Sequence, residues 1–107
     1  MIRFLPAFRV GYWSAQLSTV LEAASRWSVA ARIDVEVNHG ADGTHGAGSL
    51  HPDDLAWDLD TVGDAPADLA ALYEYLRVWL PEGFDVVWEG DHVHVEWDVH
   101  RRSALAR

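Results

Sequence analysis

The sequence predicts one small α+β domain, in which two main helices pack on a mostly antiparallel sheet. The chain has 107 residues, of which 50% are hydrophobic, so it is long enough for one compact core and too short for two. Two stretches carry apolar residues at helical spacing, and the other ordered stretches alternate apolar and polar residues as strands do. The order helix, strand, loop, strand, helix, hairpin is typical of an α+β arrangement. We therefore expect a single domain over residues 1–107.

The first helix is expected to begin after Ser14, which is available as the N-cap. Its core-facing stripe recurs at steps of three and four residues and comprises Leu17, Val20, Leu21, Ala24 and Trp27. A strand follows, because Ile33, Val35 and Val37 alternate with polar residues. The glycine-rich stretch 38–52 then reads as one long loop.

A second strand is predicted from Ala56 to Asp60, with Ala56, Asp58 and Asp60 on one face and Trp57 and Leu59 on the other. Pro66 opens the second helix, with Asp64 or Ala65 just ahead of it and Asp68 in its first turn. The core-facing stripe of this helix comprises Leu69, Leu72, Tyr73, Leu76 and Leu80, and Pro81 and Gly83 end it. Residues 84–89 and 92–99 form two strands around a tight Gly90-Asp91 turn, which predicts an antiparallel hairpin.

Composition and charge exclude several classes of function. There is no cysteine, so any metal must be held by imidazole and carboxylate groups, which suit zinc. The 8 basic and 17 acidic residues give a net charge of -9, which repels nucleic acid phosphates and anionic membranes. No stretch approaches the roughly 18 apolar residues of a membrane span. The first ten residues lack the apolar core and cleavage site of a signal peptide, so we expect the protein to stay in the cytoplasm until another system releases it.

Three of the six histidines and two regularly placed aspartates fall in two short segments, Ser49–Asp58 and Asp91–His94. His92 and His94 are two apart on a predicted strand, so both side chains project to one face. His51 precedes Asp58 by seven residues, which lets a loop residue and a strand residue meet around one ion. His51, Asp58 and His94 would supply two imidazoles and one carboxylate, which leaves the fourth zinc position to water as in a catalytic site.

Each of these residues also has an ordinary structural interpretation. A single histidine is more often a surface or a satisfied core residue than a ligand, and His39 and His100 have no partner pattern that points elsewhere. The conjunction of the two segments is what favours a metal site. Four of the tryptophans are expected to form the core around the sheet, although one or two near the site could stack on a sugar or peptide: Trp57, Trp79, Trp88 and Trp97.

The two segments resemble motifs of the zinc D-Ala-D-Ala carboxypeptidases and L-alanyl-D-glutamate endopeptidases of the hedgehog/DD-peptidase fold, including their small phage and prophage members. The first motif, Ser-x-His-x-x-Gly-x-Ala-x-Asp, is matched by Ser49, His51, Ala56 and Asp58. The second, Asp-x-x-His within a His-x-His, is matched from Asp91 to His94. The motifs and the helix between them cover about half the chain.

The resemblance implies a zinc-dependent hydrolase that cleaves an amide bond in the stem peptide of peptidoglycan. His51, Asp58 and His94 would be the ligands of Zn²⁺, and Asp91 would be the general base that takes a proton from the zinc-bound water and can return it to the leaving amine. His92 would sit beside the site. Ser49 would support the ligands through a hydrogen bond. We expect a monomer, and the phage relatives imply release by a holin at lysis.

The chain departs from the family pattern in two places. Asp54 stands where the first motif has glycine, and aspartate adopts a left-handed conformation less easily. Family members carry an upstream arginine that helps hold the substrate. Arg32, expected at the start of a strand, is the only upstream arginine near the position of the family arginine. We do not assign the substrate-holding role to it. His45 is an alternative donor to the substrate, or else an exposed loop histidine. The alternative function is a metal-stabilised phage structural or cell-wall-binding module without turnover.

Overall fold

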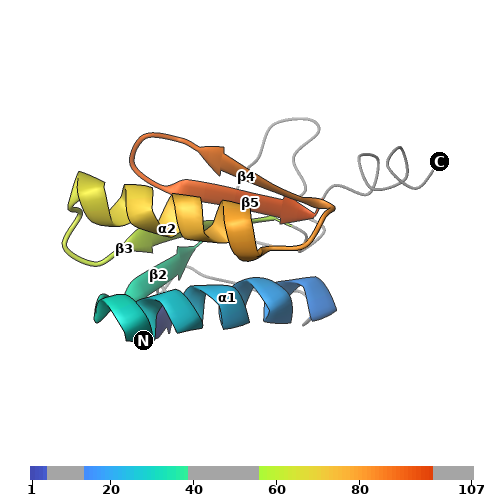
Figure 1. The fold of residues 1–107 in the computed structure, drawn as a ribbon, viewed down its shortest axis with the longest axis horizontal. Helices are drawn as coiled ribbons and strands as arrows, with labels where there is room; N and C mark the ends of the chain where they lie inside the picture. The colour runs from blue at the N-terminus through green and yellow to red at the C-terminus, as the bar shows by residue number, and fades with distance from the viewer. Residues whose placement is uncertain (5–13, 39–55, 98–107) are drawn as a thin grey trace.

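The computed structural model describes residues 1–4, 14–38 and 56–97, which form two helices packed on one face of a five-stranded sheet (Figure 1). In spatial order the strands are β1 (Ile2–Phe4), β2 (Val35–Asn38), β3 (Ala56–Thr61), β5 (Val93–Trp97) and β4 (Phe84–Trp88). The β1–β2 pair is parallel, and the other three neighbouring pairs are antiparallel. The α+β class with two helices and a mostly antiparallel sheet is confirmed.

Helix α1 (Ala15–Ala31) begins where the sequence predicts. The Ser14 hydroxyl accepts a hydrogen bond from the Leu17 N–H at 3.0 Å, which satisfies one of the free donors of the first turn. The predicted stripe is buried, except that Leu21 is only partly covered. The helix ends at Arg32, whose φ of 61° is left-handed and whose N–H donates to the Ser28 carbonyl. Arg32 therefore caps α1, and the prediction that it starts a strand is wrong.

Helix α2 (Pro66–Trp79) also follows the prediction, with proline in its first turn and Leu69, Leu72 and Leu76 buried. Figure 1 shows α1 and α2 running in opposite directions beside the sheet. Together they cover the strand residues of the core, among them Val35, Val37, Trp57, Leu59, Val93 and Val95. In the part of the chain that the structure describes, no helix is both long enough and apolar enough to cross a membrane.

Strand β1 is an element that the sequence analysis missed. It has three residues, so it is too short to show a periodic pattern. Its existence depends on pairing with β2, since Ile2 lies opposite Val35 and the Met1 carbonyl accepts from the Val35 N–H at 2.9 Å. The predicted loop also differs at its first residue, because Asn38 belongs to β2, and residues 39–52 of that loop lie outside the described residues.

The tryptophans divide between the core and the surface. Trp57 is fully buried, and Trp97 packs on the core, with its ring 4.9 Å from that of Phe84 in an edge-to-face contact. Trp79 and Trp88, in contrast, are 62% and 41% exposed, so the prediction that both help to form the core is wrong. Trp79 is the last residue of α2, and Trp88 is the last residue of the edge strand β4.

The close approach of Gly83 to Trp97 can be tested. A Cβ atom on Gly83, which has a φ of +101°, would lie 2.8 Å from Cζ3 of Trp97. Gly63 is a matched control, because it has the same φ and an added Cβ would meet none of the described atoms within 4 Å. Both alanine substitutions incur the cost of the left-handed conformation, of about 1 kcal/mol. Gly83→Ala should lower the free energy of unfolding by about 1–3 kcal/mol more than Gly63→Ala in urea denaturation, and equal losses would contradict the contact.

Candidate metal-binding and catalytic site

The sheet face opposite the helices is polar, and Asp58 and His94 meet at its centre. Asp58 on β3 lies directly opposite His94 on β5, and the carboxylate Oδ1 is 3.0 Å from the ring Nδ1. Their side chains are 14% and 17% exposed. Opposite residues of an antiparallel pair place their side chains on one face at close range. The prediction that Asp58 points away from Trp57 is confirmed, and two of the three proposed ligands are neighbours.

His92 and Asp91 extend this cluster at the hairpin turn. His92 lies one residue before β5, so its assignment to the strand is wrong, yet its Nε2 is 3.7 Å from Oδ1 of Asp58. The Asp91 carboxylate contacts Nδ1 of His92 at 2.6 Å and is itself 90% exposed. The Glu89 N–H donates to the His92 carbonyl and closes the predicted turn, in which Gly90 has a φ of +96°.

Glu96 and Asn38 belong to the same surface, and the sequence analysis missed both. The Oε2 of Glu96 lies 3.8 Å from Nε2 of His94, so carboxylates flank the imidazole at both nitrogens. Glu96 could have been found, because it follows His94 by two residues on one strand. Asn38 pairs with Asp58 across β2 and β3. Its side-chain oxygen is buried and has no hydrogen-bond partner among the described residues.

A cavity of about 320 Å³ opens on this polar face. Its wall comes from β2, β3 and the hairpin turn and consists of Glu36, Asn38, Asp58, Leu59, Asp60, Asp91 and His92. Four of these seven side chains are carboxylates. Glu36 and Asp60 lie directly opposite each other, and burial raises the pKa of Asp60. The concentration of negative charge favours a cation over a phosphate or another anion.

The charge state of His94 follows from its neighbours. The hydrogen bond to Asp58 raises the pKa of His94 above its usual value, burial opposes that shift, and the charges of Asp58, Glu96 and Glu89 add to it. The protonated imidazole is thus the form that the carboxylates stabilise when no metal is bound. A divalent ion that bound this imidazole would have to displace the proton, so its binding would depend on pH.

The Asp58–His94 pair has a geometry that suits a shared metal ion. Two donor atoms that each lie about 2.0–2.1 Å from a tetrahedral zinc are roughly 3.3 Å apart. The observed 3.0 Å between Oδ1 and Nδ1 is close to that separation. The third proposed ligand, His51, lies outside the described residues, as do Ser49 and His45. Within the described residues, no three histidine, aspartate or glutamate side chains form a group that could hold a metal.

The chain matches no family model, and it has no significant match among curated proteins.

The ion pair between Asp58 and His94 predicts a specific pH dependence in the metal-free protein. The pKa of His94 is raised in the folded state above the ordinary histidine value of 6.5. The ion pair therefore stabilises the fold fully below pH 6.5, and this stabilisation is lost as the pH rises through the folded-state pKa. Asp58→Asn should therefore lower the free energy of unfolding by about 1–2 kcal/mol near pH 6, and by less near pH 9.

The same substitution should lower the pKa of His94, which histidine NMR titration with a chelator present measures directly. Glu74→Gln is the control, because Glu74 is an exposed carboxylate on α2. An unchanged His94 pKa in Asp58→Asn would show that the 3.0 Å contact does not determine the charge of the imidazole.

Proposed function

We propose that this protein is a zinc-dependent hydrolase that cleaves an amide bond in peptidoglycan stem peptides, with a hedgehog/DD-peptidase-like fold. The main support is the meeting of Asp58 with His94 across adjacent strands, together with the cavity that Asp58 lines along with Asp91 and His92. These residues come from the two segments that resemble the family motifs. The α+β architecture is compatible with such a fold, and the negative cavity wall is compatible with a cation.

The proposed ligands are His51, Asp58 and His94. Zinc, when bound, polarises a carbonyl group and lowers the pKa of water, which allows amide hydrolysis near neutral pH. The donor atoms of Asp58 and His94 already lie 3.0 Å apart, so zinc binding would require little rearrangement of the sheet. The Glu96 carboxylate, 3.8 Å from Nε2 of His94, would help to hold the imidazole with Nδ1 toward Asp58.

Asp91 is the proposed general base. Its carboxylate is 90% exposed at the turn, where it can accept a proton from the attacking water and return it to the leaving amine. His92 contacts both Asp91 and Asp58, so it positions the base relative to the ligands. Ser49 and His45 remain proposed contacts to the ligands or the substrate. The proposed partner is the stem peptide, met by a monomer after release from the cytoplasm.

Metal content and activity should separate the ligands from the base. The purified protein should take up about one zinc per chain and release new amine termini from stem peptides or cell walls. His94→Ala should lose both zinc and activity. Asp91→Ala should keep zinc and lose about 10²–10⁴-fold in turnover, as expected for a general base.

Glu82→Ala is the control for Asp91, because Glu82 is an exposed acidic residue that precedes the same hairpin. It should leave turnover within about twofold. Failure to take up zinc would contradict the metal site. Zinc uptake without cleavage of any wall type would instead support the alternative, a metal-stabilised binding module without turnover.

Glu96 offers a test of how the imidazole is held. Glu96→Gln removes the negative charge 3.8 Å from Nε2 of His94 while keeping the size of the side chain. Zinc affinity, measured by competition with a chromogenic chelator, should fall by up to about 10-fold, since such outer partners orient histidine ligands. The matched variant Asp85→Asn changes the β4 residue opposite Glu96 and should leave zinc affinity unchanged. Equal affinities in native protein and Glu96→Gln would contradict the role of Glu96.

A further inference from the structure

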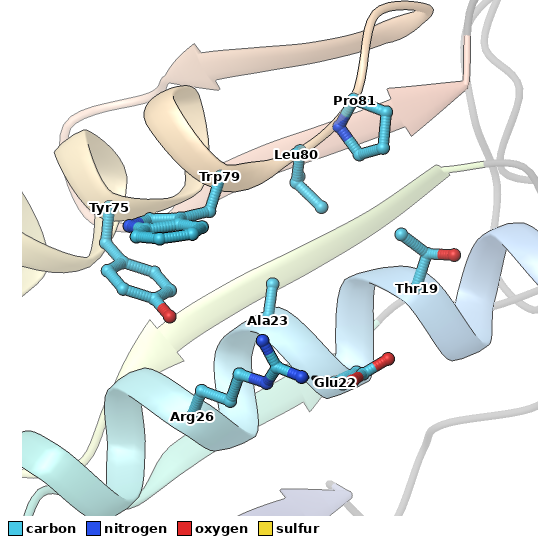
Figure 2. Close-up of a pocket in the computed structure, with 8 residues that line it drawn as sticks. All are labelled: Thr19, Glu22, Ala23, Arg26, Tyr75, Trp79, Leu80 and Pro81. Atoms are coloured by element: carbon cyan, nitrogen blue, oxygen red, sulfur yellow. Dashed lines mark hydrogen bonds and ion pairs between the residues drawn. The ribbon is translucent and has the colours of Figure 1, made fainter.

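A second cavity, of about 150 Å³, lies between α1 and α2 on the helical side of the sheet (Figure 2). Side chains from both helices and from the segment after α2 form its wall: Thr19, Glu22, Ala23, Arg26, Tyr75, Trp79, Leu80 and Pro81. It is separated from Asp58 and His94 by the sheet, since those two side chains lie on the polar face. Any ligand here would leave the proposed metal site open.

One wall of this cavity is aromatic. The Trp79 ring stacks on Tyr75 with centroids 5.8 Å apart and planes inclined by 30°, while Trp79 remains 62% exposed. Figure 2 shows both rings on the α2 side, with the Tyr75 hydroxyl directed toward α1. A large exposed ring held in place by a second ring is costly to leave in water and is preorganised for stacking with a ligand.

The facing wall is an ion pair. Arg26 donates to Glu22 at 2.7 Å through one guanidinium nitrogen and one carboxylate oxygen, and the two side chains are 66% and 65% exposed. Figure 2 shows the pair on α1 across the gap from the aromatic rings. The guanidinium has five N–H donors and the carboxylate two oxygens, so the pair keeps hydrogen-bonding groups for a ligand. The two charges cancel, which favours a neutral ligand.

Size and wall chemistry together select the class of ligand. A cavity of about 150 Å³ holds one ring-sized group, and drug-sized ligands need roughly 300 Å³ or more. An apolar side chain of a partner would fit the aromatic wall, but it would strip water from the ion pair without replacing the hydrogen bonds. A ring with apolar faces and a hydroxylated edge can stack on the aromatic wall and form hydrogen bonds with the ion pair.

We propose that this cavity binds one pyranose unit of a neutral saccharide, which stacks on Trp79 while its hydroxyls bond Glu22 and Arg26. The net charge of -9 disfavours acidic sugars. The inference is independent of the metal site and stands whether or not the protein is a hydrolase. If it is one, the cavity would hold a glycan on the side of the sheet away from the cleaved bond.

The test is an NMR titration of the full chain with two neutral oligosaccharides, chitotetraose and cellotetraose. Either should shift the indole N–H signal of Trp79 and the amide signals of the cavity, in a saturable manner. Trp79→Ala should weaken the affinity at least about 10-fold, equivalent to about 1.4 kcal/mol. Val78→Ala is the matched control, because Val78 is a 74% exposed neighbour on α2 that does not line the cavity, and it should bind as the native protein does.

Glu22→Ala tests the polar wall with the aromatic wall intact, and it should also weaken binding. Thermal unfolding of each variant confirms that the fold is kept. The proposal is overturned if neither oligosaccharide shifts these signals at millimolar concentration, or if Trp79→Ala binds as tightly as native protein. It is also overturned if the titration shows only self-association of the chain through Trp79.

Discussion

The pairing of β3 with its neighbours is the constraint on which the rest of the structure depends. β3 lies between β2 and β5, and Trp57 and Leu59 on one of its faces are fully buried beneath the helices. A slip of one residue would turn Trp57 toward the polar face and Asp58 into the core. The cost of such a slip fixes the register, and the register in turn places Asp58 opposite both Asn38 and His94. Burial of apolar groups on one face thereby determines which polar groups meet on the other.

The polar face has electrostatic properties that no single residue would have. His94 is mostly buried and lies between the carboxylates of Asp58 and Glu96, which stabilise its protonated form. Carboxylates that attract a proton also attract a divalent ion, so a proton and the proposed metal would compete for the same imidazole. Asp91, in contrast, is held at an exposed turn by His92. The cluster thus combines partly buried groups suited to ligation with one exposed group suited to proton transfer, which is the division that the proposed hydrolase requires.

The two sides of the sheet carry different chemistry. The polar face concentrates carboxylates and imidazoles, whereas the helical side has a cavity with stacked rings on α2 and an ion pair on α1. Trp79 ends α2 and is exposed, whereas the next residue, Leu80, packs into the core. A tryptophan that does not contribute to the core is available for recognition. Separation by the sheet would allow both cavities to be occupied at once.

Local pattern determined much of this protein. Four features depend on residues within a few positions of one another. They are the cap of α1 at Ser14, the start of α2 at Pro66, the Gly90-Asp91 turn and the face of β3 that carries Asp58. Strand β1, the partner of Asn38 and the exposure of Trp79 depend on contacts between residues far apart in the chain. Periodicity states which face of an element is apolar, but it does not state which element covers that face. Tertiary packing alone decided that Asp58 would meet His94, because only the pairing of β3 with β5 brings residues 36 positions apart within 3.0 Å.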